Sequence, residues 1–398
     1  MYILVINAGS SSLKYQLMKK QTQEVVGKGL CEKVGMTDSF HKYEISGTEN
    51  LAVIPINDHH DAVKAVLDTF LNADGGFLKT LDEIVAVGHR VVHGGEYFSE
   101  SVVIDEEVLE RIQECVPLAP LHNPPALMGI EACIDLIPSA VQVAVFDTAF
   151  FQTIPPKAYM YALPYEMYEN YRIRKYGFHG TSHRYVAQRT ASFLGKPLQE
   201  LKIVTCHLGN GCSLSAVDGG KAVDNSLGFT PLDGLMMGTR CGSIDPAIVT
   251  YMINKLGMTA DEAENLMNRK SGLLGISGIS NDLRDVRSAA EEGNDRAILA
   301  YEIYSNTVKK FIGQYVYEMA GVDAIVFAGG VGENDVRMRQ MILGDLGPLG
   351  IKLDPERNKQ RGGERLISTD DSSVSLLVIP TNEELMIVQD VIRILDIS

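Results

Sequence analysis

Apolar runs in the first third of the chain alternate between the spacing of a strand and the spacing of a helix. The runs of strand length are residues 2–7, 13–18, 24–30, 84–92 and 141–146. Helical spacing predicts helices over 60–72 and 106–115. We expect Asn123 to cap a third helix with Pro124 as its first residue, and we expect irregular β structure over 31–55. Strands and helices mixed in this way predict an α/β domain.

The second half of the chain repeats this order. Its runs of strand length are residues 203–207, 214–217, 221–226, 324–327 and 376–379. Asp245 and Pro246 open one helix, and a long amphipathic helix covers 294–320. Residues 328–334 then form a glycine-rich turn, and Asn382 starts a final helix. Because this helix follows a complete second domain, we expect it to pack on the first.

The length of 398 residues exceeds one typical hydrophobic core and predicts two domains. We expect the first to comprise residues 1–150 together with the final helix, 384–398, and the second to comprise residues 151–383. No low-complexity linker separates them, and only Pro155-Pro156 marks the join.

A glycine-rich turn of the same plan recurs in the two halves. Asn7-Ala-Gly-Ser-Ser-Ser-Leu-Lys14 follows the first strand, and His207-Leu-Gly-Asn-Gly-Cys-Ser213 repeats the plan with one residue inserted. The glycines allow the backbone to approach a ligand, while Ser, Asn and backbone N–H groups can donate to phosphate oxygens. One such hairpin alone would be ordinary structure. Its recurrence, with Lys14 directly beyond the first turn, predicts that the two halves bind one nucleotide.

The composition and net charge of the chain limit the classes of molecule that it can bind. The formal net charge of −15 argues against nucleic acid or an anionic membrane as the main partner. No apolar stretch approaches the roughly 20 residues that span a bilayer, and the N-terminus lacks the features of a signal peptide. The six cysteines include no Cys-x-x-Cys pair and are typical of reduced thiols, so we expect a cytoplasmic protein.

Two arginines lie in glycine-rich loops, one in each half. Arg90 stands in His89-Arg-Val-Val-His-Gly-Gly95, and Arg240 stands between Gly238 and Gly242. A guanidinium group can hold a carboxylate or phosphate with two parallel hydrogen bonds. Either arginine alone would more often form a structural ion pair. Together they fit the transfer of a charged group across a cleft between domains.

The glycine-rich segments do not match common nucleotide motifs. The chain has neither a G-x-x-x-x-G-K-[ST] loop nor a kinase-type His-Arg-Asp loop. Gly329-Gly-Val-Gly332 follows a strand but lacks the spacing of a dinucleotide-binding loop. We interpret it as a shelf for adenosine or an α-phosphate, with a plain strand-to-helix connection as the alternative.

Histidines and acidic residues supply further candidates. His179 and His183 have the spacing of two zinc ligands on a helix, but the Glu of the zinc motif is missing between them. His179 fits better as a donor to developing negative charge, with a structural histidine as the alternative, and His183 fits a structural role. Asp147 ends a buried strand, and Glu383 lies between a strand and a helix. Both are candidates for Mg²⁺, which prefers oxygen ligands beside nucleotide phosphates.

Several of these segments together resemble the acetate kinase family. They are Asn7–Lys14, His89–Gly95, Phe178–His183, Gly330–Asn334 and Thr381–Glu384. The resemblance runs from the first strand to the last helix without a departure at a position that the family uses for chemistry. It implies two duplicated ribonuclease H-like domains, as in actin, Hsp70 and sugar kinases, around a nucleotide cleft. It also implies reversible, direct in-line phosphoryl transfer between ATP and acetate, giving ADP and acetyl phosphate.

The resemblance assigns roles to individual residues. Asn7 and Glu383 would organise Mg²⁺ or Mn²⁺, Arg90 would hold the acetate carboxylate, and Arg240 and His179 would stabilise the phosphoryl group in transfer. Asp147 would position reacting groups rather than act as an obligatory base, because acetate is already ionised at pH 7. The residues expected around ATP or ADP are Ser10, Ser12, Lys14, His207, Leu208, Gly209, Asn210, Gly211, Asp282, Leu283, Arg284, Gly329, Gly330, Val331, Gly332, Glu333 and Asn334. Those expected around the acetate methyl group are Val92, Leu121, Phe178 and Pro231, with His122 nearby.

Two other functions fit parts of the pattern. A propionate or butyrate kinase would use the same apparatus, and pocket size decides between these substrates. A non-enzymatic nucleotide switch of the actin or Hsp70 kind is the other alternative, but such a switch would not require Arg90, His179 and Arg240. The resemblance further implies a homodimer formed through the second domain.

Overall fold

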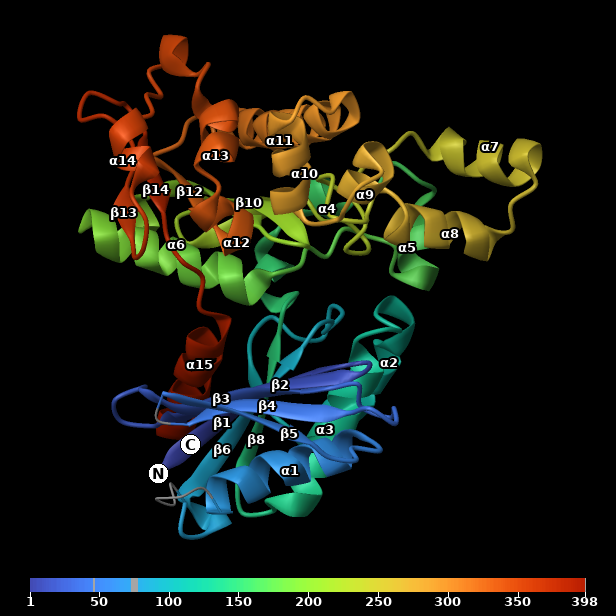
Figure 1. The fold of residues 1–398 in the computed structure, drawn as a ribbon, viewed down its shortest axis with the longest axis vertical. Helices are drawn as coiled ribbons and strands as arrows, with labels where there is room; N and C mark the ends of the chain where they lie inside the picture. Colours follow the sequence, from blue (N-terminus) through green and yellow to red (C-terminus); the bar gives the residue numbers. More distant parts are fainter. Residues whose placement is uncertain (46, 73–77, 398) are drawn as a thin grey trace. The chain divides into compact units, whose positions relative to one another are not determined.

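The structure is a computed structural model that describes residues 1–45, 47–72 and 78–397. Two compact units divide the chain (Figure 1). The first comprises residues 1–152 and 382–398, and the second comprises residues 153–381. The C-terminal segment therefore belongs to the unit that the N-terminus begins.

The first unit is built on one mixed sheet in the order β5-β4-β3-β2-β1-β6-β8-β7. Its strands are β1 (Tyr2–Gly9), β2 (Ser12–Lys19), β3 (Val25–Glu32), β4 (Phe40–Ile45), β5 (Thr48–Val53), β6 (Ile84–Val91), β7 (Val102–Val103) and β8 (Val141–Phe146). Its helices are α1 (His59–Asn72), α2 (Glu106–Glu114), α3 (Asn123–Leu136) and α15 (Glu383–Ile397). Strands β1 to β5 form an antiparallel meander, while β1, β6 and β8 run parallel.

Helices cover both faces of this sheet, and the alternation of side chains along β1 shows how. Leu4 and Ile6 pack with residues of α1 and α3 on one face. Ile3 and Val5 point the other way and pack against α15. At Gly88 in β6, a Cβ atom would lie 2.5 Å from the side chain of Ile387, so glycine lets α15 approach the sheet closely.

The second unit has a smaller sheet in the order β11-β10-β9-β12-β14-β13. Its strands are β9 (Lys202–Leu208), β10 (Cys212–Asp218), β11 (Lys221–Asn225), β12 (Ala324–Ala328), β13 (Arg365–Leu366) and β14 (Ser375–Val378). Its helices are α4 (Pro156–Tyr159), α5 (Tyr165–Tyr171), α6 (Gly180–Leu194), α7 (Pro246–Leu256), α8 (Ala260–Arg269), α9 (Gly272–Ser277), α10 (Leu283–Glu291), α11 (Asp295–Glu318), α12 (Gly329–Asn334), α13 (Val336–Leu343) and α14 (Pro355–Lys359). The apolar strand β12 is buried throughout.

The two sheets share one plan. Each begins with a three-stranded antiparallel meander, β1-β2-β3 or β9-β10-β11, and continues with two parallel strands, β6-β8 or β12-β14. Each ends in a short antiparallel edge strand. The repeat seen in the sequence is thus a repeat of topology, and the turns after β1 and β9 occupy the same place in the two sheets.

Three local predictions were wrong. Asn123 does not cap α3: His122 occupies the cap position, and the Asn123 side chain instead bonds the backbone N–H and C=O of His93. The β character expected over 31–55 is present, but the expected irregularity was wrong where the regular strands β4 and β5 lie. The segment after β12 is the short helix α12 rather than a turn, followed at once by α13.

Candidate functional site

Polar side chains gather where the parallel strands of the first unit end. Asn7 lies near the end of β1, Arg90 near the end of β6, and Asp147 directly after β8. Because these strands are adjacent and parallel, their carboxyl ends meet at one edge of the sheet. Glu383, the first residue of α15, joins them. The fold thus brings together four residues that are far apart in the sequence.

Arg90 is held at the centre of this group by oxygen atoms. Its Nε and Nη2 atoms donate to Oδ1 and Oδ2 of Asp147 at 3.2 and 2.5 Å. Its Nη1 atom donates to Oδ1 of Asn7 at 3.4 Å, and Nε lies 3.7 Å from Oε2 of Glu383. Burial alone would lower the pKa of Arg90, but the Asp147 and Glu383 carboxylates outweigh it and raise the pKa. Asp147, 1% exposed, therefore fixes the plane of a permanently charged guanidinium group.

The turn between β1 and β2 adds a lysine to the same unit. Lys14 pairs with Asn7 across the hairpin and forms an ion pair with Glu384. Gly9 and Ser12 close the hairpin, and Ser10 is exposed at its tip. Lys14 keeps half of its side chain exposed, so it can reach a ligand from this position.

The charges around Arg90 do not balance. In the ion pairs that the described residues form here, Asp147, Glu383 and Glu384 contribute three carboxylates and Arg90 and Lys14 two cations, so carboxylates exceed cations by one. Burial raises the pKa of Glu383, and the Asp147 and Glu384 carboxylates raise it further, while Arg90 opposes them. This excess of negative charge, among carboxylate and amide oxygens, fits a hard divalent cation.

No three His, Cys, Asp or Glu side chains form a metal cage anywhere in the described ranges. Mg²⁺ does not need one, because it is usually held by one or two carboxylates, retained waters and substrate phosphates. Asn7 and Glu383 fit that donor set.

In the second unit the guanidinium group of Arg240 has a different environment from that of Arg90. Arg240 lines a hollow of about 280 Å³ together with His179, Asn210, Gly211, Gly238, Thr239 and Asn281. Its Nη1 atom donates to the carbonyl oxygen of Pro231 at 3.2 Å and lies 4.0 Å from the sulfur of Met237. Among the described residues, no carboxylate forms an ion pair with Arg240, and burial lowers its pKa. Its positive charge is not neutralised by the protein around it.

His179 lies beside this arginine in an unusual backbone conformation. It is the N-cap of α6 with φ 61° and ψ 29°, the left-handed region that residues other than glycine seldom adopt. Its ring stacks on that of His207, with 4.5 Å between centroids, and its Nδ1 atom lies 2.8 Å from Oγ of Ser213. A Cβ atom at Gly211 would lie 3.4 Å from the His179 ring and 4.0 Å from Nη1 of Arg240. Glycine at position 211 therefore keeps the space between these two groups open.

A second cavity of about 460 Å³ lies next to this hollow, with Asn210 and Asn281 lining both. Eight of the seventeen residues predicted to surround the nucleotide line it: Gly209, Asn210, Asp282, Leu283, Arg284, Gly330, Val331 and Asn334. Asp282 caps α10 and binds Arg284 through that residue's backbone N–H and guanidinium group. The remaining lining residues are Leu273, Asn281, Arg287, Tyr304, Asp335 and Arg361, none of which was predicted.

Gly329, Gly332 and Glu333 were also predicted around the nucleotide but do not line this cavity. Glu333 accepts from the backbone N–H groups of Gly329 and Thr381 at 2.9 and 3.3 Å. Gly329 has φ 76°, and a Cβ atom there would lie 2.8 Å from the carbonyl oxygen of Leu208. Gly332 is buried at the end of the same short helix.

Two buried arginines hold the end of α12. Arg339 donates from Nη1 to the carbonyl oxygen of Gly332 at 2.7 Å, and Arg365 donates from Nη2 to that of Glu333 at 2.8 Å. Burial lowers the pKa of Arg339 to about 10. Cations at the C-terminal carbonyl groups of a helix stabilise it, so these arginines fix the wall of the cavity.

The residues predicted around the acetate methyl group are divided between the units. Val92, 9% exposed, and Leu121, 61% exposed, belong to the first unit, as does His122. Phe178, 2% exposed, and Pro231 belong to the second. The methyl pocket therefore stays a prediction.

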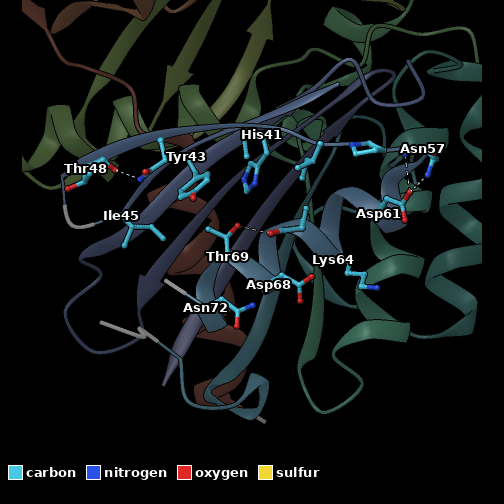
Figure 2. A pocket seen from close by; sticks show the side chains of 15 residues that line it. His41, Tyr43, Ile45, Thr48, Asn57, Asp61, Lys64, Asp68, Thr69 and Asn72 are labelled. Carbon is cyan, nitrogen blue, oxygen red and sulfur yellow. Dashed lines mark hydrogen bonds between the residues drawn. The ribbon is translucent and has the colours of Figure 1, made fainter. Parts of the chain in front are cut away.

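A large hollow of the first unit lies away from these residues. It measures about 910 Å³ and is lined by β4, β5 and α1, including Tyr43, Lys64 and Asp68 (Figure 2). It contains none of the residues that the sequence analysis selected. Size alone therefore does not select the candidate site, which is distinguished by the guanidinium group of Arg240, without a carboxylate partner among the described residues. Within the described ranges, no helix has the length and apolarity needed to cross a bilayer.

Comparison with known proteins gives matches over nearly the whole chain. The sequence model of the acetokinase family matches residues 2–389. Acetate kinase of Thermoanaerobacter pseudethanolicus is 54% identical over 98% of both chains. Acetate kinase of Clostridium novyi is 55% identical over 100% of this chain and 99% of its own.

Solved structures agree with these matches. The crystal structure of Porphyromonas gingivalis acetate kinase matches with a TM-score of 0.96 and 46% identity, covering 99% of each chain. That of a propionate kinase from Francisella tularensis matches with a TM-score of 0.91 and 43% identity, covering 98% of each chain. These matches, with the shared plan of the two sheets, confirm the predicted α/β fold of two duplicated domains.

Proposed function

The chain belongs to the acetokinase family, and from that membership we propose that it transfers a phosphoryl group reversibly between ATP and acetate. The products are ADP and acetyl phosphate, formed by direct in-line transfer. The observation that carries the proposal is Arg240, a partly buried guanidinium group without a carboxylate partner among the described residues, in a hollow next to a larger cavity. Leaving such a charge unpaired is costly for a folded protein unless an anion binds there.

The difficulty of the reaction is electrostatic. Acetate is ionised at pH 7 and needs no strong base to become a nucleophile, but it must approach an anionic phosphate. Positioning and charge stabilisation therefore do most of the catalysis. In the proposed reaction Arg90 holds the acetate carboxylate, and Arg240 and His179 stabilise the transferred phosphoryl group.

Asp147 has a positioning role in this proposal. Its two oxygens bind Nε and Nη2 of Arg90, which fixes the guanidinium plane and leaves Nη1 on the side of Asn7. Both carboxylate oxygens of Asp147 are thus engaged by Arg90. The arrangement therefore supports an orienting group for Arg90 rather than an obligatory base.

Asn7 and Glu383 are the residues proposed to hold Mg²⁺ or Mn²⁺, and Lys14 is proposed to contact phosphates with Ser10 and Ser12. A bound cation would supply positive charge to the phosphate oxygens and draw them into position. The excess negative charge of Asp147, Glu383 and Glu384 over Arg90 and Lys14 supports a cation at this place.

Propionate is a second candidate substrate. The propionate kinase from Francisella tularensis is 43% identical over 98% of this chain, so substrates differing by one CH₂ group occur among close relatives. An apolar pocket discriminates one CH₂ group by only about 1–3 kcal/mol. We propose acetate as the preferred substrate and expect measurable turnover of propionate.

The formation of acyl hydroxamate tests the proposal. Purified protein is incubated with ATP, Mg²⁺, acetate and hydroxylamine, and hydroxamate and ADP are measured together. The proposal predicts hydroxamate in proportion to ADP and dependent on acetate. ATP hydrolysis without hydroxamate would indicate a nucleotide switch instead.

A homodimer is the proposed state in solution, formed through the second unit. Ile244, Ile248, Tyr251 and Leu256, on and beside α7, are 37 to 61% exposed and offer an apolar surface that a second copy could cover. Sedimentation of the native protein and of Tyr251→Glu would test this, with a shift to monomer expected for the variant.

The cytoplasm is the proposed location, supported by six cysteines that are all free thiols.

A further inference from the structure

We infer that a chain of hydrogen bonds behind His179, running through Ser213, His183 and Thr205, determines which ring nitrogen of His179 carries a proton. The inference deepens the proposed function, since it concerns a group assigned there to the phosphoryl site. Ser213, His183 and Thr205 act in it as positioning residues, because the proposed function assigns the contact with the phosphoryl group to His179 and not to them.

The contacts form an unbroken series within the second unit. Nδ1 of His179 lies 2.8 Å from Oγ of Ser213, and the same hydroxyl lies 2.6 Å from Nε2 of His183. Nδ1 of His183 lies 2.7 Å from Oγ1 of Thr205. Ser213 and Thr205 are on neighbouring strands, β10 and β9, and both are buried, with 0 and 1% exposure. Water therefore does not compete for these contacts.

The far end of the series supplies an acceptor that favours one direction. Oγ1 of Thr205 lies 3.4 Å from the carbonyl oxygen of Ser215, and a carbonyl oxygen can only accept. Once the Thr205 hydroxyl proton points to Ser215, its oxygen accepts from Nδ1–H of His183. Each hydroxyl has one proton to donate, so the direction of one hydrogen bond in the series determines the direction of the next.

His183 transmits the direction because it is neutral. It is 1% exposed, and burial together with the nearby His207 lowers its pKa well below the usual value. A neutral imidazole has one N–H group, and when that is on Nδ1, Nε2 must accept. The Ser213 hydroxyl therefore donates to Nε2 of His183, and its oxygen accepts from Nδ1–H of His179.

This arrangement keeps a proton on Nδ1 of His179, so Nε2 is where the ring gains or loses its second proton. When Nε2 is protonated, the ring is a cation with an N–H donor and joins Arg240 as positive charge for the phosphoryl oxygens. When Nε2 is bare, it presents a lone pair, which an anion avoids. The charged and titratable groups that the described residues of the second unit place near His179 include His183, His207 and Arg240.

Nitrogen-15 NMR of histidine-labelled protein tests the inference, because protonated and bare ring nitrogens have distinct shifts. The chain has nine histidines, and the His179→Asn spectrum identifies the signals of His179 by difference. The ring is observed at a pH where it is neutral. Thr205→Val and Thr205→Ser are the matched variants, since valine keeps the shape without the hydroxyl and serine keeps the hydroxyl.

The inference predicts that neutral His179 is protonated on Nδ1 in the native protein and in Thr205→Ser. In Thr205→Val, His183 loses its acceptor, the series reverses, and His179 carries its proton on Nε2. Turnover in Thr205→Val is expected to fall about tenfold with little change in KM, because a neutral donor replaces a charged one, and Thr205→Ser restores it.

Protonation of Nε2 in the neutral native protein would overturn the inference, and this result does not depend on whether the Thr205 variants fold. An unchanged His179 tautomer in folded Thr205→Val would overturn it as well. Both results are independent of whether acetate is the substrate. Failure of the hydroxamate assay would remove the proposed function and leave the tautomer unaffected.

Discussion

Replacing Arg240 with alanine should separate catalysis from stability in this protein. In the second unit the guanidinium group makes one hydrogen bond to a carbonyl oxygen, at 3.2 Å, and has no carboxylate partner among the described residues. Burial lowers its pKa, which means that the fold disfavours its charge. The variant should therefore unfold at an unchanged or higher temperature in the absence of ligands, while catalysis is lost.

The size of the catalytic loss follows from the contacts that the group can offer. A hydrogen bond to a charged group contributes about 1.5–3 kcal/mol, and a guanidinium group can make two to one phosphoryl group, or about 3–6 kcal/mol. At about 1.4 kcal/mol per decade, kcat should fall by roughly 10²–10⁴. Arg240→Lys keeps the charge without the fork and should recover part of this loss.

The assay combines steady-state kinetics in both directions with thermal unfolding. Arg189→Ala is the matched control, because Arg189 lies in the same unit but is paired with Glu364 at 2.7 Å. We expect near-native turnover for that variant. If Arg240→Ala kept near-native kcat, or if its loss of activity were matched by a loss of folded protein, the role of Arg240 would be refuted.

Three further predictions concern other parts of the molecule. Val92→Ala should shift the ratio of kcat/KM for acetate and propionate toward propionate by up to tenfold, and an unchanged ratio would exclude Val92 from the methyl pocket. Glu383→Gln should raise the Mg²⁺ concentration needed for half-maximal turnover, measured by titration, and an unchanged requirement would place the cation elsewhere. His89, 2% exposed, has its pKa lowered by burial to about 4 from 6.5, so the unfolded chain binds more protons between these values and stability falls as the pH drops through this window. The cost should reach roughly 3 kcal/mol near pH 4, and denaturant unfolding of His89→Leu should show a shallower decline, whereas an identical slope would contradict the assignment.

The repeated architecture was open to prediction from the sequence because its signals are local. Apolar runs of strand length and the recurring turn after Asn7 and His207 reveal two meanders, and the structure has both. The cap of α3 was not predictable in the same way. Asn123 has the right type and place for a cap, but its side chain binds the backbone of His93, a contact between distant segments.

Residues of the candidate site could be selected from the sequence only where they stand in a recognisable motif. Arg90, His179 and Arg240 stand in glycine-rich or basic clusters, and the structure places each among polar groups of its own unit. Tyr304 lines the larger cavity from the middle of α11, where its spacing is that of a buried core residue. Ser213 was named only as part of the repeated turn, and only the pairing of β9 with β10 shows that it lies between two histidine rings.

Inhibition by ADP, Mg²⁺ and a planar phosphoryl mimic such as aluminium fluoride, with and without acetate, tests the central claim most directly. If cationic groups of both units stabilise phosphoryl transfer to a carboxylate, the mimic should inhibit far more tightly than ADP alone. The tight inhibition should require acetate and should be lost in both Arg90→Ala and Arg240→Ala. Equal inhibition without acetate, or in either variant, would contradict the account.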